Sequence, residues 1–287
     1  MTFDLTNGCP ALQPGTCYFD LPCQDFRGSG DLYRIFVHVP DGEPPAAGWP
    51  VLYMTDGNAV IATAADALRA QASYPKGTNV CKGMIVAIGY PTDNAYDPLR
   101  RSWDLSPPPG AEYPPFFENT PVVRTGGADQ FLGFLLQTLR PWLERHYPID
   151  RSAQTLFGHS FGGLFALYAL SQHPDAFRNW VAASPAIYWE DGIVRTCLDR
   201  MDAAAWGRPQ VVIPTHATDQ IVTGGWLQDA GAGRCLLDED QAPNVLAEAL
   251  ERALAGDHDR GAAALAETLA ALPSPDEAIT TALARCA

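Results

Sequence analysis

The apolar residues of this chain gather into short runs, separated by polar, glycine-rich or proline-rich segments. Such a run is typical of a buried β-strand. Several runs are almost entirely apolar, which is typical of a sheet covered on both faces. The pattern predicts six strands, at residues 32–40, 50–54, 84–90, 153–157, 179–184 and 210–213.

Between these strands lie segments whose apolar residues recur at helical spacing or which are rich in alanine. They predict helices at residues 59–71, 128–147 and 163–170. Strands that alternate with helices indicate an α/β fold, with a mostly parallel central sheet flanked by helices. Neither an internal repeat nor a linker interrupts the pattern, so we expect a single domain over residues 1–287.

Two segments depart from the alternation. Residues 91–125 are rich in prolines and aromatic residues, and we expect a long irregular loop over the site. Loops of this length tend to be functional or disordered. Residues 240–287 read as helix throughout, which predicts an atypical helical C-terminal part. The last predicted helix begins at Ser274-Pro275-Asp276-Glu277, a capping box with proline at the first helical position.

Composition and charge narrow the class of protein. The chain has 287 residues, 47% of them hydrophobic, and a net charge of −14 without a block of basic residues. This charge argues against nucleic acid and against an anionic membrane surface as partners. No apolar run approaches the ~20 residues of a membrane span. The first residues do not resemble a secretory signal, so we expect a cytoplasmic protein.

Seven cysteines are scattered along the chain, and none forms a Cys-x-x-Cys pair, so no zinc site is expected. Cys9, Cys17 and Cys23 lie close together and leave one disulfide open as an alternative. Reduced thiols are favoured in a cytoplasmic context.

Residues Gly158-His159-Ser160-Phe161-Gly162 have the Gly-x-Ser-x-Gly form of a nucleophile elbow. This turn presents a serine hydroxyl between a strand and a helix, and its glycines are needed where a Cβ would meet neighbouring backbone. A predicted strand precedes the motif and a predicted helix follows it. We therefore expect Ser160 to be a catalytic nucleophile.

A serine hydroxyl needs a base, and the base needs a group that orients it. In this type of fold both follow the serine in sequence, which excludes His38 and His146. His159 is next to the serine and is expected to pack near the sheet. His173 ends the following helix, where a surface position is expected.

Two histidines remain as candidate bases. His258 lies in a polar turn between predicted helices, and His216 lies just past a predicted strand end. Asp219 is the favoured acid, because loops at the carboxyl ends of strands surround such a site. Weaker alternatives for the acid are Asp257, Asp259 and Glu190. The sequence thus favours Ser160, Asp219 and His258, with His216 as the alternative base.

An oxyanion requires two backbone N–H donors. One is expected from Phe161, the residue after the nucleophile, and the other from the loop after an early central strand. That loop is Asp56-Gly57-Asn58, and Asn58 is the first choice.

Taken together, these motifs are far more specific than the elbow alone. The chain resembles the α/β-hydrolases of the siderophore trilactone esterase group, in the esterase D-like superfamily, which cleave esters of the enterobactin, salmochelin and bacillibactin type. The resemblance covers roughly residues 30 to 195 and rests on PVLYMTDGN (50–58), IGYP (88–91), RRSWDLSP (100–107), TGGA (125–128), TLFGHSFGG (155–163) and AASP (182–185). It implies the α/β-hydrolase fold and a serine esterase activity without metal or other cofactor.

Four further residues are candidates for substrate binding. A guanidinium of Arg100 or Arg101 can hold a carboxylate or phenolate or stack on an aromatic ring, and it can equally brace the loop against Asp104 or a carbonyl. Trp103 lies in the same loop, and Trp189 can line an aryl pocket or cap the core.

The sequence therefore predicts a serine esterase that hydrolyses a small-molecule carboxylic ester or lactone, with a bulky aryl or natural-product group. Two alternatives stay open. The same site can transfer the acyl group to another alcohol, or the chain is a non-catalytic binding protein on a hydrolase scaffold.

Overall fold

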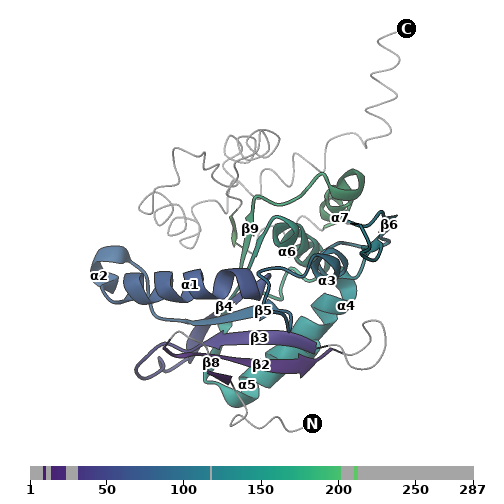
Figure 1. Ribbon diagram of the computed structural model, residues 1–287. Helices are drawn as coiled ribbons and strands as arrows, with labels where there is room; N and C mark the ends of the chain where they lie inside the picture. Colours follow the sequence, from purple (N-terminus) through teal and green to yellow (C-terminus); the bar gives the residue numbers. More distant parts are fainter. Residues whose placement is uncertain (1–8, 11–13, 24–31, 117, 202–209, 213–287) are drawn as a thin grey trace.

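A computed structural model describes residues 9–10, 14–23, 32–116, 118–201 and 210–212. Its main feature is an eight-stranded sheet with the strand order β1-β2-β3-β5-β4-β8-β9-β10 (Figure 1). The strands are β1 (Cys9–Pro10), β2 (Thr16–Pro22), β3 (Leu32–His38), β4 (Trp49–Met54), β5 (Met84–Gly89), β8 (Ile149–His159), β9 (Asn179–Ala183) and β10 (Gln210–Val212).

The five strands from β5 to β10 run parallel, whereas β1, β2 and β3 pair antiparallel at one edge. The predicted mostly parallel central sheet is therefore confirmed. Strand β2 was not expected from the sequence. Its side chains alternate between buried and more exposed positions, with Leu21 and Phe19 buried and Asp20 exposed. A segment this short forms a strand here because it pairs with β3 along its whole length.

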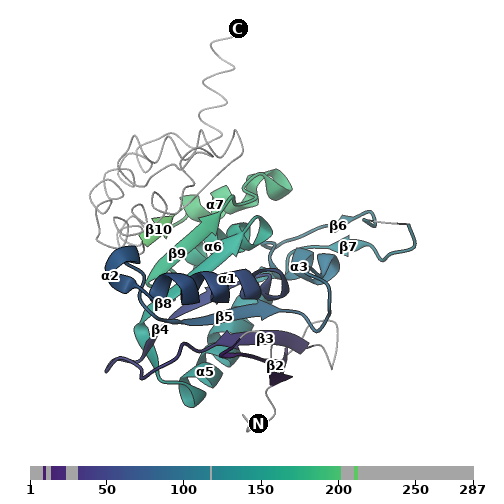
Figure 2. The same cartoon turned by 60° about the vertical axis from the view of Figure 1, so that its left-hand side comes forward.

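The described helices are α1 (Gly57–Ala72), α2 (Pro75–Thr78), α3 (Pro98–Asp104), α4 (Ala128–Gly133), the π-helical η2 (Phe134–Leu139), α5 (Arg140–His146), α6 (Phe161–Gln172), the 3-10 turn η3 (Trp189–Gly192) and α7 (Ile193–Asp199). Within the described ranges, α1 covers one face of the sheet, and α4 to α6 cover the other (Figures 1 and 2).

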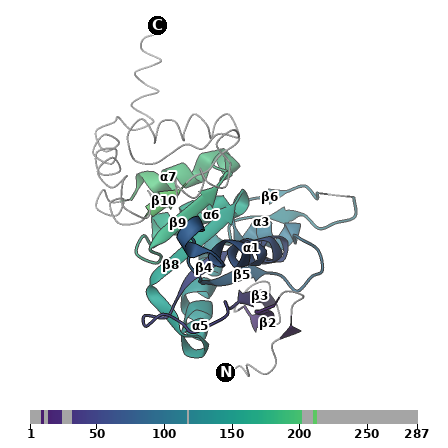
Figure 3. The ribbon, with the colours of Figure 1, turned by 90° about the vertical axis from the view of Figure 1, so that its left-hand side faces the viewer.

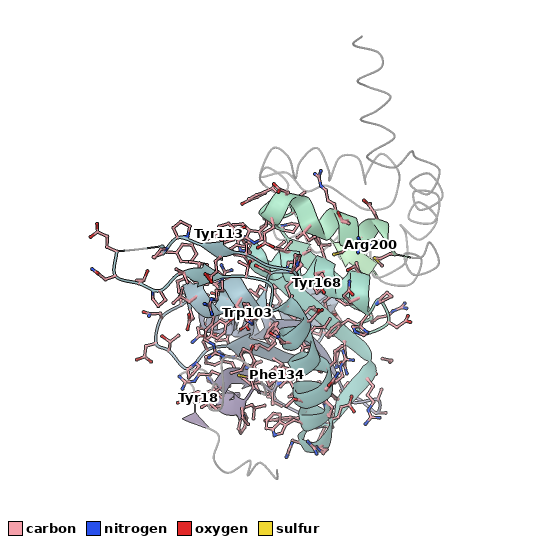
Figure 4. All side chains as sticks on the ribbon, turned by 90° about the vertical axis from the view of Figure 1, so that its right-hand side faces the viewer. Tyr18, Trp103, Tyr113, Phe134, Tyr168 and Arg200 are labelled. Atoms are coloured by element: carbon pink, nitrogen blue, oxygen red, sulfur yellow. The ribbon has the colours of Figure 1, made fainter. Side chains whose placement is uncertain are left out.

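Side chains of successive strand residues point to opposite faces of the sheet, so each central strand contributes to the hydrophobic cores on both faces. Val51 and Tyr53 of β4 join the large core under α4 to α6, whereas Leu52 and Met54 pack with Ile61 of α1. The expected two-sided covering of the sheet is confirmed. Figure 4 shows Phe134 and Tyr168 on the helical layer of the larger core.

The helix predicted over 128–147 is present at 128–146, but its middle is π-helical. The N–H of Arg140 bonds to the carbonyl of Leu135, five residues earlier. Pro141 follows directly, and a proline has no N–H and clashes with the carbonyl four residues before it. The wider turn accommodates this proline inside a continuous helical rod.

Residues 91–125 are more ordered than the predicted irregular loop. They contain α3 and a two-stranded ribbon of β6 (Glu112–Tyr113) and β7 (Val123–Arg124), which projects from the body of the protein (Figures 2 and 3). Asp97 caps α3 by accepting a hydrogen bond from the N–H of Arg100 at 3.1 Å, and Pro98 occupies the first turn. This Asp-Pro pair is a helix-start signal that the sequence contains.

In the described part of the chain, no helix is both long and apolar enough to span a membrane. The same residues contain no group of three or more His, Cys, Asp or Glu side chains that could hold a metal ion. Among the described cysteines, Cys17, Cys23, Cys81 and Cys197 are not joined in disulfides. The helices expected in 240–287 lie outside the described residues, so they and the single-domain organisation stay predictions.

A buried carboxyl group fastens α3 to the sheet. Asp104 is 1% exposed, and its Oδ1 accepts a hydrogen bond from the hydroxyl of Tyr33 at 2.8 Å. The guanidinium of Arg100 lies over the rings of Tyr33 and Tyr90, at 5.0 and 4.7 Å from their centroids. Burial disfavours the charged form and raises the pKa of Asp104 to about 7.

We expect Asp104→Asn to remove a pH dependence of stability. The raised pKa means that the folded protein retains a proton that the unfolded chain releases near pH 4, so the contribution of Asp104 to stability falls as the pH rises from about 4 to about 7. An amide does not titrate. From pH 5 to pH 8 the free energy of unfolding of the wild type should therefore fall by about 2–3 kcal/mol relative to that of the variant.

Urea unfolding at both pH values measures this difference. Asp66→Asn is the control, because this carboxylate is 61% exposed, and its difference from the wild type should stay constant. An equally constant difference for Asp104→Asn would contradict the expectation.

Candidate active site

Ser160 lies in the sharp turn between β8 and α6, with the uncommon backbone angles φ 56° and ψ −114°. Its N–H donates to the carbonyl of Ala183, and its own carbonyl accepts from the N–H groups of Leu164 and Ala186, at 2.9 to 3.1 Å. The predicted strand, turn and helix around Ser160 are confirmed. A non-glycine residue held in such a conformation by its surroundings is a frequent feature of functional sites.

The glycines of the motif are required by close backbone approach. A Cβ on Gly158 would lie 1.9 Å from the carbonyl oxygen of Gly162. A Cβ on Gly162 would lie 2.1 Å from Oγ1 of Thr55, at the end of β4. The turn at Ser160 therefore packs directly against the loop that follows β4.

Two helices begin side by side at this edge of the sheet. Strands β4 and β8 are parallel neighbours, and the N–H of Thr55 bonds to the carbonyl of Phe157 at 3.2 Å. Asp56 precedes α1 and Ser160 precedes α6, and neither side chain caps its helix. The first N–H groups of a helix lack internal partners, and they carry its positive dipole end. Asn58 and Phe161, the predicted oxyanion donors, both lie in these first turns.

The side chain of Asn58 has a role that sequence reasoning missed. Its Nδ2 donates to the carbonyls of Tyr90 and Thr92, both at 2.9 Å, and its Oδ1 accepts from the N–H of Tyr90 at 2.8 Å. Three hydrogen bonds thus tie the start of α1 to the end of β5. The backbone of Asn58 is held in place from the neighbouring strand.

Arg100 and Arg101 both make contacts within the protein. The Nη1 of Arg100 donates to the carbonyl of Leu32 at 2.7 Å. Nε and Nη2 of Arg101 donate to the two carboxylate oxygens of Asp56, at 2.8 and 2.9 Å. These contacts favour the bracing interpretation of the arginines over the substrate-holding one, although Arg101 pairs with Asp56 and not with Asp104.

The two candidate tryptophans have different surroundings. Trp189 packs edge-on against the ring of Phe161 at 4.7 Å between centroids, and its ring also lies 5.3 Å from that of Tyr113 of β6. Trp103 donates from Nε1 to Oε1 of Gln130 at 3.1 Å, below the projecting ribbon on which Tyr113 lies (Figure 4). Trp189 is therefore in contact with the residue after Ser160, whereas Trp103 joins α3 to α4.

Glu190, one of the three weaker alternatives for the acid, accepts a hydrogen bond from the hydroxyl of Thr125. This contact links the 3-10 turn after β9 to the base of the ribbon. The carboxylate is thus engaged in fastening the ribbon beside the elbow.

Three of the four described histidines lie away from the elbow. His38 pairs with Ile85 near the start of β5, and His146 ends α5 just before β8 begins. His173 follows the far end of α6 and is exposed. All three are at the amino-end edge of the parallel strands, so the sequence argument against them agrees with the topology.

His159 is the last residue of β8 and pairs with Ala183 of β9, so it belongs to the sheet as expected, but its side chain is exposed and does not pack in the core. His258, His216 and Asp219 lie outside the described residues, as do the alternative acids Asp257 and Asp259, so the assignment of base and acid stays a prediction.

Comparisons with known proteins agree with this geometry. A family model described as "Putative esterase" matches residues 29–232. Ferri-bacillibactin esterase BesA of Bacillus subtilis is 38% identical over 191 residues, which are 66% of this chain and 65% of the relative. A siderophore enterobactin esterase of Emericella nidulans is 42% identical over 197 residues, 64% of this chain and 63% of the relative. The chain thus spans less than two thirds of the length of these relatives.

A solved structure with the same fold is that of the BES protein from Bacillus cereus. It superposes with a TM-score of 0.70 at 25% identity, over 85% of this chain and 98% of that one. The similarity confirms the α/β-hydrolase fold and the resemblance to siderophore esterases.

We expect Gly158→Ala to destabilise the protein by about 2 kcal/mol or more, because the added Cβ has no space against the Gly162 carbonyl. The matched control is Gly133→Ala, in the helical rod, where a Cβ meets nothing within 4 Å. It should raise the stability by about 0.5–1 kcal/mol through helix propensity. Urea unfolding followed by circular dichroism measures both, and equal effects would contradict the steric account.

Proposed function

Because the chain belongs to the esterase family whose model it matches over residues 29–232, we propose that it is a serine esterase. It hydrolyses a carboxylic ester or lactone through an acyl-serine intermediate. The observation that carries the proposal is the strained Ser160, which stands where the uncapped N-termini of α1 and α6 meet.

In the proposed reaction the Ser160 hydroxyl oxygen attacks the carbonyl carbon of the ester, and its proton passes to His258, with His216 as the alternative base. Asp219 orients the imidazole. The carbonyl oxygen becomes an oxyanion, which the N–H groups of Phe161 and Asn58 stabilise. The bond to the leaving alcohol then breaks, and the alcohol takes the proton from the imidazole.

Water completes the reaction. It attacks the acyl-serine and gives its proton to the same imidazole, the carboxylic acid leaves, and Ser160 recovers its proton. The first turns of two helices favour the negative charge of both tetrahedral intermediates, because their N–H groups are fixed before the reaction begins.

We propose a siderophore-type ester or another bulky aryl ester as the substrate. The curated relatives named above are esterases of ferri-bacillibactin and enterobactin. The ring of Trp189 contacts those of Tyr113 and of Phe161, the residue after Ser160, and these aromatic side chains suit an aryl group.

Labelling with a fluorophosphonate probe tests the nucleophile. We expect stoichiometric labelling of the wild type, together with hydrolysis of p-nitrophenyl butyrate, and loss of both in Ser160→Ala. Ser152→Ala, an exposed serine early in β8, is the control and should behave as the wild type. A wild type that neither reacts with the probe nor cleaves the ester would contradict the proposal and favour a binding protein.

Alanine substitutions also separate the two bases. His258→Ala should lower kcat/KM by about three orders of magnitude or more, because the serine loses its proton acceptor. His216→Ala and the exposed control His173→Ala should change it little. A large loss in His216→Ala, with His258→Ala near wild type, would reverse the assignment.

A further inference from the structure

We propose that Arg101 is a positioning residue of the oxyanion hole, which keeps the carboxylate of Asp56 away from the N–H groups at the start of α1. This inference rests on the proposed esterase function, because it assigns these N–H groups to an oxyanion.

The argument begins with the unusual use of Asp56. It stands directly before α1 in a left-handed backbone conformation, with φ 55° and ψ 42°. An aspartate at this position ordinarily accepts a hydrogen bond from the second or third N–H of its helix. The Asp56 side chain makes no such bond. Arg101 binds both of its carboxylate oxygens instead, at 2.8 and 2.9 Å.

Because Asp56 pairs with Arg101, its carboxylate does not cap the N–H of Asn58, which is the proposed oxyanion donor. The N–H of Ala59 bonds to the main-chain carbonyl of Asp56 at 2.9 Å. The N–H of Asn58, the second in the helix, is the donor that a capping carboxylate would take. A carboxylate there would occupy the place of the oxyanion and repel it with a like charge. By holding Asp56, Arg101 leaves the Asn58 N–H available.

Arg101 also reaches the other half of the site. Its Cζ lies 5.2 Å from the centroid of the Phe161 ring. Asp56 and Arg101 expose only 6% and 15% of their side chains, so the pair is shielded from solvent. Two parallel hydrogen bonds to one carboxylate need the planar guanidinium, and the single ammonium of lysine cannot reproduce them.

Steady-state kinetics on p-nitrophenyl butyrate test the proposal, because this neutral ester offers no anionic group for an arginine to hold. Arg101→Met should lower kcat at least tenfold and leave KM within twofold of the wild type. The kcat of Arg101→Lys should lie between that of the wild type and that of Arg101→Met. Arg69→Met removes an arginine paired with an exposed aspartate on α1, and it is the control for the loss of a charge.

A double substitution shows whether Arg101 acts by holding the Asp56 carboxylate or only by stabilising the loop. Glycine readily adopts the backbone angles of residue 56 and has no carboxylate. Asp56→Gly combined with Arg101→Met should therefore recover part of the kcat that Arg101→Met alone loses. A double variant that is no more active than the single one would overturn the proposal. So would a raised KM with unchanged kcat, which identifies Arg101 as a substrate-holding group.

Amide hydrogen exchange, resolved by residue with NMR, gives a readout that needs no activity. In Arg101→Met the released carboxylate caps α1, so the Asn58 amide should exchange more slowly than in the wild type, Arg69→Met or the double variant. Faster or unchanged exchange would overturn the proposal. If exchange slows but the wild type neither reacts with fluorophosphonate nor cleaves esters, the proposed function fails, and what stands is that Arg101 keeps the Asp56 carboxylate from capping α1.

Discussion

The close approach of two turns at the ends of neighbouring strands is the constraint on which the site depends. Gly158 and Gly162 let β8 turn into α6 at Ser160, and the absence of a Cβ on Gly162 lets this turn pack on Thr55. Because β4 and β8 are parallel neighbours, both chains leave the sheet at the same edge. Two helix N-termini are thereby directed at one point, where they favour negative charge.

Holding these two turns in register requires support from outside them. The Asn58 side chain fastens the start of α1 to the end of β5. Helix α3 adds a second support, because Arg101 holds Asp56 and contacts the ring of Phe161. The helix itself is anchored to strand β3 by the hydrogen bond between Asp104 and Tyr33. The segment 91–125 therefore acts as a brace for the site, in addition to any contact it makes with a substrate.

The arrangement also explains why polar side chains are buried here. Both carboxylate oxygens of the buried Asp56 and both polar atoms of the half-buried Asn58 side chain are hydrogen-bonded, and Oδ1 of the buried Asp104 accepts from Tyr33. A loop held this way has its N–H groups in place before an oxyanion forms. In the proposed reaction this preorganisation would stabilise the oxyanion, because donors fixed in advance need no reorganisation when the charge develops.

The sequence by itself determined the central strands, the parallel sheet and the turn at Ser160, because apolar runs and a glycine-spaced serine report local requirements of the backbone. It also contained the signal for α3, in Asp97-Pro98, although the segment was expected to be irregular. Only the tertiary structure decided the strand β2, the partner of Arg101, the exposure of His159 and the raised pKa of Asp104. Each of these depends on contacts between residues far apart in the chain. A pattern along the sequence reports what a segment can form, but pairing across the sheet and burial by other segments decide what it contacts and how it is charged.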